Sequence, residues 1–281
     1  MNRFNVALLQ VDSQQDKAAN LRKIGGFIDE AARRGADFVS MPEMCAYIAR
    51  KPDESGNDGC LDNAESVPGP ITEFMASKAR EHGIWIHGGS IHERIDGAKK
   101  TYNTTVVYSP KGDIAAVYRK IHLYDVDVKG GVSYRESDAI EPGGEIVTFD
   151  TPYCRMGLAI CYDIRFPEVF RILTLRGAKV IFNPAEFALY TGKDHWEALI
   201  RARAIENECY MVCAGQIGIK PTMHTYGRSI VVDPWGNVIA KASDKEGVLM
   251  AEIDVDYVDK LRTEVPCLSN RRPKTYVWPE N

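Results

Sequence analysis

The sequence predicts an α/β protein with a single domain in which strands are enclosed by helices. Short apolar, β-rich runs alternate with segments of helical periodicity through most of the 281 residues, a pattern typical of helices packed on sheets. The intervals between these elements are short, and no Pro/Ser-rich linker or repeat divides the chain. The composition, with 44% apolar and 26% charged residues, is sufficient for one large core.

The first part of the chain predicts two helices set between strands. Residues 16–34 carry apolar side chains on one helical face, and Gly35 marks the end of that helix. Residues 70–82 predict the second helix, because Pro70 suits a first turn and Gly83 a helix end. A Ser-Pro-Lys-Gly-Asp turn predicts a hairpin between the last two strands of this part. Strands are expected over residues 5–10, 37–41, 84–91, 104–108 and 114–118.

The second part of the chain predicts two further helices. Residues 167–176 form one of them, which Gly177 closes. A capping-box pattern of Asp194 and Glu197 predicts that the other begins there and extends to about Glu208. An Asp-Pro-Trp-Gly-Asn turn predicts another hairpin. Strands are expected over residues 156–160, 180–182, 210–215, 229–232, 238–240 and 249–253.

Charge and cysteine usage narrow the possible functions. The net charge of −4 and the lack of a basic block disfavour nucleic acid or an anionic membrane as the main partner. No apolar stretch approaches the ~18 residues that a membrane span needs, and the N-terminal apolar run is too short for a signal peptide. Seven cysteines without the close pairing of a zinc site predict reduced thiols in the cytoplasm and no metal.

Cys161 is the first candidate for chemistry. It follows a predicted buried strand and precedes a helix that begins near Pro167. Such a turn holds a nucleophile rigidly, close to helix N-terminal dipoles and to N–H groups that can face an oxyanion. The alternative is a buried core cysteine, the common fate of a free Cys. Cys209 and Cys213 share one face of a strand, but no His completes a metal site, so core packing is favoured.

Two charged residues also follow predicted strands. Glu43 comes directly after residues 37–41, at a strand end where acidic side chains often line a cleft. Its alternative is a solvated loop carboxylate. Lys120 lies in an apolar run just past a strand, so it either extends along the surface to water or points inward to a charge. Neither residue alone indicates a function, but their order along the chain with Cys161 does.

Taken together, these residues resemble the nitrilase superfamily of carbon–nitrogen hydrolases. Three motifs carry the resemblance, in the family's order: Pro42-Glu43, Arg119-Lys120-Ile121-His122-Leu123 and Cys161-Tyr162-Asp163-Ile164-Arg165-Phe166-Pro167-Glu168. The similarity extends from about Phe4 to about Tyr276. It implies a four-layer α-β-β-α sandwich over residues 1–281. It also implies a homodimer or higher homo-oligomer, with residues 256–281 as a C-terminal extension in the dimer contacts.

The resemblance implies a catalytic triad of Glu43, Lys120 and Cys161, with Glu136 as a second glutamate and no cofactor. Cys161 would attack a small amide and form a thioester, while Glu43 moves the protons. Lys120 and the backbone N–H of Tyr162 would hold the oxyanion. The Gly-rich residues 129–137, which include Glu136 near their end, are expected to form a mobile lid. An ordinary surface loop is the alternative.

The Cys-Tyr-Asp form resembles the amidase branches of the family more than the nitrile-hydrolysing Cys-Trp-Glu form. The nearest similarity is to ω-amidases and deaminated-glutathione amidases, which implies a side-chain amide of an α-keto acid as substrate. By the same resemblance Arg165 would bind the substrate carboxylate and Phe187 would line the pocket, with Tyr47 as a further substrate-binding residue. An ion pair of Arg165 with Glu168 or Asp163 is the alternative.

Glu186 departs from the family pattern, which has a small residue before Phe187. Facing the pocket, Glu186 would repel a second carboxylate and favour amides that carry an amine or guanidine. Facing away, it would pair with a surface Arg or Lys. The alternatives to a keto-acid amidase are therefore an amidase for cationic amides, an N-carbamoyl amine or amino acid hydrolase with the same triad, and a catalytically silent binding subunit.

Overall fold

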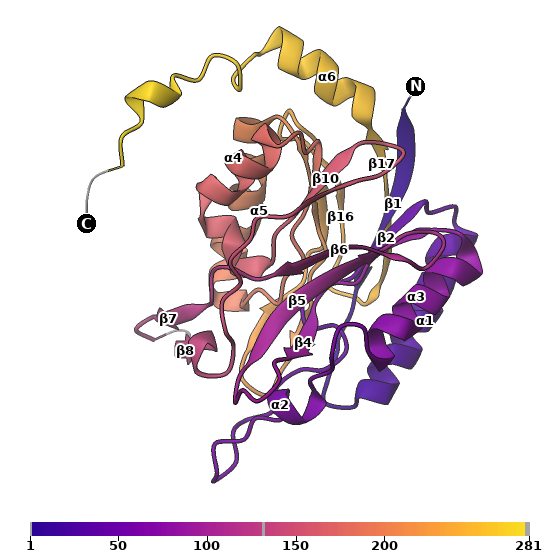
Figure 1. Ribbon diagram of the computed structural model, residues 1–281, viewed down its shortest axis with the longest axis vertical. Coiled ribbons are helices and arrows are strands. Elements are labelled where there is room, and N and C mark those ends of the chain that lie inside the picture. The colour runs from indigo at the N-terminus through magenta and orange to yellow at the C-terminus, as the bar shows by residue number, and fades with distance from the viewer. Residues whose placement is uncertain (1, 131–132, 279–281) are drawn as a thin grey trace.

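The computed structural model describes residues 2–130 and 133–278, which form two β-sheets packed face to face between two layers of helices (Figure 1). The four-layer sandwich expected from the sequence is therefore confirmed. Helices α1 (Lys17–Arg33) and α3 (Pro70–His82) cover the first sheet, and α4 (Pro167–Leu175) and α5 (Leu189–Asn207) cover the second.

The first sheet has seven strands in the order β17-β1-β2-β3-β5-β4, with β6 pairing with β5. Its central strands β1, β2 and β3 are parallel, as expected for strands joined through crossover helices. The strands are β1 (Arg3–Gln10), β2 (Phe38–Ser40), β3 (Trp85–His87), β4 (Ile91–Arg94), β5 (Thr101–Tyr108), β6 (Ile114–Arg119) and β17 (Gly247–Asp254).

The second sheet has six strands in the order β16-β15-β12-β11-β10-β9. Strands β10, β11 and β12 are parallel, and the predicted hairpin joins β15 to β16. The strands are β9 (Thr148–Asp150), β10 (Arg155–Leu158), β11 (Val180–Phe182), β12 (Tyr210–Cys213), β15 (Ile230–Val232) and β16 (Val238–Lys241).

Strand β1 shows why the sandwich needs both sheets and helices. Its side chains alternate between two cores: Val6 and Leu8 pack in the core shared with the second sheet, and Ala7 and Leu9 pack under α1 and α3. Because successive residues of a strand face opposite sides, a continuous apolar run is buried only when both faces of the sheet are covered. Asp16 begins α1 by accepting a hydrogen bond from the N–H of Ala19 at 2.9 Å.

The strand predicted over residues 84–91 is divided into β3 and β4, which is a correction. The chain turns at Gly88 and Gly89, and Gly89 has a φ of 64°. A Cβ at Gly89 would lie 2.1 Å from the carbonyl oxygen of Pro42. Glycine is therefore required here, because only a residue without a side chain lets this turn pack against the loop that carries Glu43.

Helix α5 begins at Leu189, five residues before the Asp194 start that the capping-box pattern predicted. Tertiary packing explains the earlier start. Gly192 lies against the ring of Tyr226, where a Cβ would be 2.6 Å from a side-chain carbon. Trp196 is buried and donates a hydrogen bond to the carbonyl of Arg228 at 2.9 Å. These contacts fix the first turns of the helix, so the local capping preference is overridden.

Several short elements were not predicted from the sequence. They are α2 (Cys60–Asn63), the hairpins β7 (Asp125–Asp127) with β8 (Ser133–Arg135) and β13 (Ile217–Ile219) with β14 (His224–Tyr226), and α6 (Val255–Glu264). The segment expected to be a lid, residues 129–137, includes β8 and the start of a 3-10 helix, Glu136–Asp138. Its residues 131–132 lie outside the described part of the chain.

After β17, helix α6 leads to a segment that extends along and away from the sandwich, with a short 3-10 helix at Pro273–Thr275 (Figure 1). This segment exposes Tyr276, Val277 and Trp278, at 57%, 83% and 73% of their surface. Within the ranges that the structure describes, none of the helices combines the length and the apolar character that crossing a membrane requires.

The carboxyl ends of parallel strands from both sheets point to one end of the sandwich. Glu43 follows β2 in the first sheet, and Cys161 and Glu186 follow β10 and β11 in the second. The same end of the molecule carries α2 and the β7–β8 hairpin (Figure 1). A crevice at the carboxyl ends of strands is where α/β proteins usually place a ligand.

Candidate active site

Cys161 begins a 3-10 helix, Cys161–Arg165, directly after β10. Its backbone φ of 45° lies in the left-handed region, which a non-glycine residue adopts only when its surroundings impose it. Its N–H donates to the carbonyl of Pro184 at 2.8 Å, and its side chain is buried. Tyr162 lies in the first turn of the same short helix, where N–H groups have no partner within the helix.

Asp163 fixes the turn that carries Cys161. Its fully buried carboxylate accepts hydrogen bonds from the N–H of Ile160 at 2.8 Å, the hydroxyl of Tyr118 at 2.6 Å and Nδ1 of His122 at 2.8 Å. The His122 ring in turn stacks on Phe166, with ring centroids 3.6 Å apart. Both Asp163 and His122 belong to the sequence motifs, so the signal was present, but the sequence did not show that they bond to each other.

Glu43 lies buried among hydrogen-bond donors. Its Oε1 accepts from Nζ of Lys120 and from Nδ2 of Asn103, both at 2.8 Å, and its Oε2 accepts from the N–H of Glu186 at 2.7 Å. Its carboxylate lies near the Cys161 thiol, and the two groups influence each other's pKa. Burial alone would raise the pKa of Glu43, but the Lys120 ammonium outweighs it and holds the pKa below its ordinary value. The group is therefore an ionised base beside a thiol.

Lys120 points inward, with 2% of its side chain exposed, so the surface alternative is wrong. Its Nζ lies 3.0 and 2.8 Å from the two carboxylate oxygens of Glu136. The N–H of Tyr124 and Nδ2 of Asn103 also donate to Glu136, at 2.6 and 3.1 Å. Burial would lower the pKa of Lys120, but Glu136 and Glu43 outweigh it and raise the pKa well above its ordinary value. Lys120 is therefore charged.

Asn103 was not predicted as a site residue, although it bridges the two glutamates. It lies within β5, and asparagine is depleted in strands. The strand expected from the sequence began at residue 104, so Asn103 lay just outside it, and no local signal marked it as a site residue.

The Cys161 thiol is protonated in the resting site. Burial raises its pKa well above the ordinary value, the nearby Glu43 carboxylate raises it further, and Lys120 opposes both without reversing them. For Cys161 to act as a nucleophile, its proton would have to move to Glu43 as the new bond to sulfur forms, because the raised pKa disfavours a free thiolate in the resting site.

These side chains enclose a small cavity of about 50 Å³. Its wall is formed by Glu43, Met44, Ala49, Cys60, His92, Asn103, Lys120, Tyr124, Tyr134, Glu136, Ala139, Ile140, Cys161, Glu186 and Met223. Of the two orientations considered for Glu186, the structure has the inward one. A narrow recess continues past Cys161 and is lined by Tyr162, Glu186 and Phe187.

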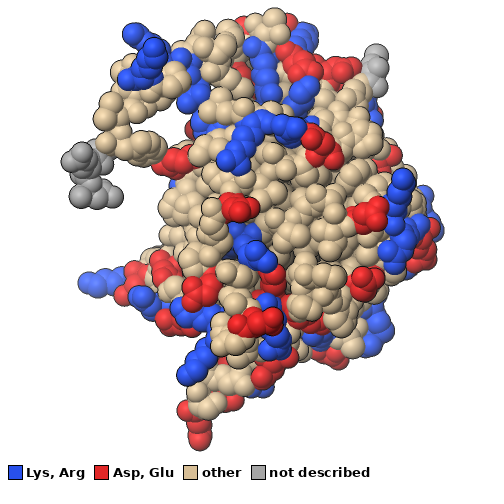
Figure 2. Space-filling view, viewed as in Figure 1, with Lys and Arg blue, Asp and Glu red and all other residues tan. Residues whose placement is uncertain are grey.

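A wider outer cavity of about 930 Å³ leads to the small one, and Cys60, Tyr134, Ala139 and Met223 line both. The outer cavity carries charges of both signs: Lys51, Lys99, Arg135, Asp58, Asp62 and Asp138. Figure 2 shows acidic and basic side chains interspersed over this end of the molecule, around α2 and the β7–β8 hairpin. A small molecule therefore enters through a polar, mixed-charge entrance.

Arg165 packs against two aromatic residues of the recess wall, Tyr162 and Phe187, rather than forming an ion pair. Its guanidinium carbon is 5.4 Å from the ring centre of Phe187 and 5.7 Å from that of Tyr162. Among the described residues it has no salt bridge to Glu168 or to any other acidic group, and its Nη1 lies 3.3 Å from Nδ1 of His195. The guanidinium is thus available to an anion.

Tyr47 is not brought to the cavity wall. Its hydroxyl donates to the carbonyl of Asp58 at 3.3 Å, and its ring packs edge-on against His92, which does line the cavity. The sequence placed Tyr47 near the site, but it could not show that His92, and not Tyr47, forms the cavity wall here. Cys209 and Cys213 are buried core residues, and all seven cysteines are free.

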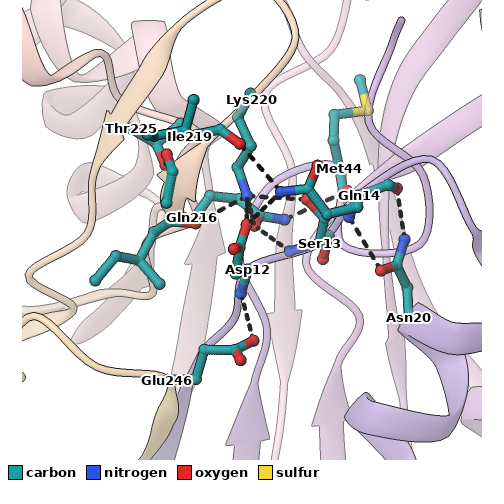
Figure 3. A network of polar contacts seen from close by, with 12 residues as sticks. Asp12, Ser13, Gln14, Asn20, Met44, Gln216, Ile219, Lys220, Thr225 and Glu246 are labelled. Atoms are coloured by element: carbon teal, nitrogen blue, oxygen red, sulfur yellow. Dashed lines mark hydrogen bonds and ion pairs between the residues drawn. The ribbon is translucent and has the colours of Figure 1, made fainter.

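A network of hydrogen bonds and an ion pair holds the loop that follows β2 (Figure 3). Nζ of Lys220 donates to Oδ1 of Asp12 at 2.6 Å and lies 3.2 Å from Oε1 of Gln216. Nε2 of Gln216 donates to the backbone carbonyl of Glu43 at 3.1 Å. Gln216 therefore connects the ion pair of the buried Lys220 with the half-buried Asp12 to the backbone of the predicted base.

Comparison with known proteins identifies the family. The family model for carbon-nitrogen hydrolases matches residues 5–263. The chain is 40% identical to human omega-amidase NIT2 over 279 residues, which is 98% of each chain. It is 41% identical to bovine deaminated glutathione amidase over 276 residues, or 96% of this chain and 83% of the relative. The crystal structure of the C. elegans NitFhit protein superposes with a TM-score of 0.89 at 37% identity, covering 98% of this chain and 66% of that one.

The fold, the buried Glu–Lys–Cys cluster and these matches place the chain in the carbon–nitrogen hydrolase family. It is an amidohydrolase that acts on carbon–nitrogen bonds other than peptide bonds.

Proposed function

We propose that this chain hydrolyses the side-chain amide of a small α-keto acid, such as 2-oxoglutaramate or deaminated glutathione, and releases ammonia or an amine. One observation carries the proposal: Glu43, Lys120 and Cys161 meet in one buried cavity beside a recess lined by Phe187, and the Arg165 guanidinium lies 5.4 Å from the ring centre of Phe187. The similarity to an omega-amidase and to a deaminated glutathione amidase supports the same substrate class.

In the first half of the reaction, Glu43 takes the thiol proton while sulfur of Cys161 attacks the amide carbonyl. The carbonyl oxygen becomes an oxyanion, which Lys120 and the N–H of Tyr162 stabilise, and each such donor lowers the barrier by about 3 kcal/mol. Glu43 then gives its proton to the nitrogen as the carbon–nitrogen bond breaks. Ammonia leaves, and the acyl group remains on sulfur as a thioester.

In the second half, water replaces ammonia beside Glu43. Glu43 removes a proton from this water, whose oxygen attacks the thioester carbonyl, and the same two donors hold the second oxyanion. The carbon–sulfur bond breaks, Glu43 returns its proton to sulfur, and the product is formed as a carboxylic acid, which loses its remaining proton to solvent on release. Glu136 contributes by holding Lys120 in place through its two short contacts.

The recess beside Cys161 suits the keto-acid end of such a substrate. Arg165 presents a guanidinium without an acidic partner among the described residues, and a guanidinium can bind a carboxylate through two parallel hydrogen bonds. The ring of Phe187 packs against the guanidinium and forms an apolar part of the recess wall. The outer cavity leaves room for a larger group on the amide nitrogen.

We also propose a cytoplasmic homodimer in which the extension formed by residues 256–281 contributes to the contacts. The exposed aromatic and apolar side chains of Tyr276, Val277 and Trp278 support this, because such groups are usually covered in an assembly. The seven free cysteines agree with a reducing compartment. Sedimentation of the full chain and of a chain ending at residue 265 tests the assembly. A monomeric full chain would refute the dimer, and an unchanged dimer of the shortened chain would refute the role of the extension.

The substrate proposal is tested by hydrolysis of a panel of amides: 2-oxoglutaramate, deaminated glutathione, glutamine, aliphatic amides, cationic amides and N-carbamoyl compounds. Ammonia release is measured for the primary amides and N-carbamoyl compounds, and release of the free amine is measured for deaminated glutathione. We expect the keto-acid amides to be hydrolysed fastest and Cys161→Ala to abolish the reaction. Carbon dioxide released together with ammonia would indicate an N-carbamoyl hydrolase instead. Inactivity on every compound, with no labelling of Cys161 by an electrophile, would indicate a silent binding subunit.

A further inference from the structure

Glu186 presents an unpartnered carboxyl to the catalytic cavity. Its backbone N–H is used, because it donates to Oε2 of Glu43 at 2.7 Å. Its carboxyl, by contrast, forms neither a hydrogen bond nor an ion pair with any residue in ranges 2–130 and 133–278, although it lines both the small cavity and the recess past Cys161. A largely buried polar group without a partner is costly, so its partner is expected to be a ligand.

Glu186 and Arg165 both adjoin Phe187, Glu186 in the sequence and Arg165 through a contact with the ring. Glu186 directly precedes Phe187, the ring over which the Arg165 guanidinium is placed at 5.4 Å. Glu186 and Phe187 line the same recess. A substrate that occupies this recess therefore meets Glu186 and Phe187 in its wall, and the Arg165 guanidinium packs against the ring of that same Phe187.

The charge around Glu186 decides which form of the carboxyl is present. The charged or titratable groups near it, or lining the same cavities, are Glu43, Lys120, Glu136, Cys161, Lys220, Cys60, His92, Tyr124, Tyr134 and Tyr162. Burial, and then the Glu43 carboxylate, raise the pKa of Glu186 to about 8, and Lys220 and Lys120 oppose that rise only in part. At neutral pH the group is a carboxylic acid with an O–H to donate.

We propose that Glu186 determines substrate specificity by donating a hydrogen bond, as a neutral carboxylic acid, to an oxygen of the substrate's α-keto acid end. This inference rests on the proposed function and deepens it. It also reverses the expectation from the sequence that an inward Glu186 selects a cation. A neutral acid does not repel the substrate carboxylate, and it supplies a donor that complements the Arg165 guanidinium.

If Glu186 donates this hydrogen bond, substrate binding is coupled to protonation of the Glu186 carboxyl. Above pH 8, binding of an anionic amide requires that Glu186 first takes up a proton, so affinity for that amide falls as the pH rises. A residue with a structural role alone has no such linkage. Glu186→Gln keeps a neutral donor of the same shape and removes the titration.

The test is calorimetric binding of 2-oxoglutaramate to Cys161→Ala, which cannot turn the amide over, and to Cys161→Ala/Glu186→Gln, from pH 6.5 to 9.5 in buffers of different ionisation enthalpy. For Cys161→Ala we expect Kd to be constant below pH 8 and to rise about tenfold per pH unit above it, with proton uptake approaching one per ligand. For the double variant we expect neither effect. Circular dichroism at each pH confirms that both proteins remain folded.

Three results would overturn the proposal while leaving the substrate assignment intact. One is tight binding of 2-oxoglutaramate by Cys161→Ala with no proton uptake at any pH. Another is the same uptake in both variants. The third is a preference of Cys161→Ala for a cationic amide that Glu186→Gln abolishes, which would mean that Glu186 acts as an anion. Failure of the proposed function is distinct from these, because it requires that 2-oxoglutaramate is neither bound nor hydrolysed.

Discussion

Lys120 and Glu136 form a buried ion pair in which Nζ lies 3.0 and 2.8 Å from the two carboxylate oxygens. Glu43 approaches the same ammonium at 2.8 Å, so one cation lies between two carboxylates. Nζ has three protons, and the two glutamates occupy them in the resting site. The ammonium must therefore share a donor with an oxyanion when one forms, and Glu136 keeps it within reach.

Glu136→Gln should lower kcat about 10²-fold, because Nζ of Lys120 loses one of its two fixed anionic partners and is no longer held at the cavity wall. Steady-state ammonia release measures this loss. Glu145→Gln, an exposed position, is the matched control and should leave kcat unchanged. An equal kcat for Glu136→Gln and the wild type would show that Glu43 alone positions Lys120.

Glu186→Gln should stabilise the protein at alkaline pH. The pKa of Glu186 is raised to about 8 in the folded state, above its ordinary value of 4.5. Between these values the folded chain binds a proton that the unfolded chain has lost, so stability falls as pH rises through this window. The partly exposed position limits the effect at pH 8.5 to on the order of 2 kcal/mol.

Urea unfolding at pH 5 and pH 8.5 measures this effect. We expect the stability difference between Glu186→Gln and the wild type to be small at pH 5 and to favour the variant at pH 8.5. An equal difference at both pH values would mean that the folded state does not shift the titration of Glu186.

Asp163→Asn should impair both folding and catalysis. The carboxylate accepts from Ile160, Tyr118 and His122 at once, and an amide replaces one acceptor oxygen by a donor. We expect a loss of about 2–4 kcal/mol in unfolding free energy and a lower kcat, because the strained turn at Cys161 loses its anchor. Thermal unfolding and labelling of Cys161 by iodoacetamide measure the two effects. Asp194→Asn, on the exposed face of α5, should show neither.

Gln216→Ala should lower kcat with little change in global stability. The variant removes the hydrogen bond to the Glu43 carbonyl and leaves the Lys220–Asp12 pair in place. We expect a several-fold loss of kcat and about 1 kcal/mol of unfolding free energy. Gln14→Ala is the control, because Gln14 bonds to Asp12 in the same network (Figure 3) but has no hydrogen bond to Glu43. Equal effects of both variants would assign the network to stability alone.

Much of the candidate site was predictable from the chain. Glu43, Lys120 and Cys161 were identified from three motifs in order, and the cluster they form lies at the predicted strand ends. Strong local signals were also sufficient for α1, α3 and α4, whose proline, glycine and apolar patterns mark their limits closely. These features depend on residues near one another in sequence, where backbone propensity and periodicity act directly.

Other features depended on contacts between distant residues. The early start of α5 follows from packing of Gly192 against Tyr226, and the division of residues 84–91 follows from the approach of Gly89 to Pro42. Asn103, His92 and Gln216 joined the site only through such contacts. No local pattern encodes them.

The sequence by itself determined the α/β class, the order of its main elements and the residues proposed to cleave an amide. The tertiary structure decided the direction in which Glu186 points, the donors around Glu43 and the protonation state that each buried group holds. The physical reason is that residue types and spacing set what a side chain can do, whereas desolvation and charge from distant segments set the state in which it does so.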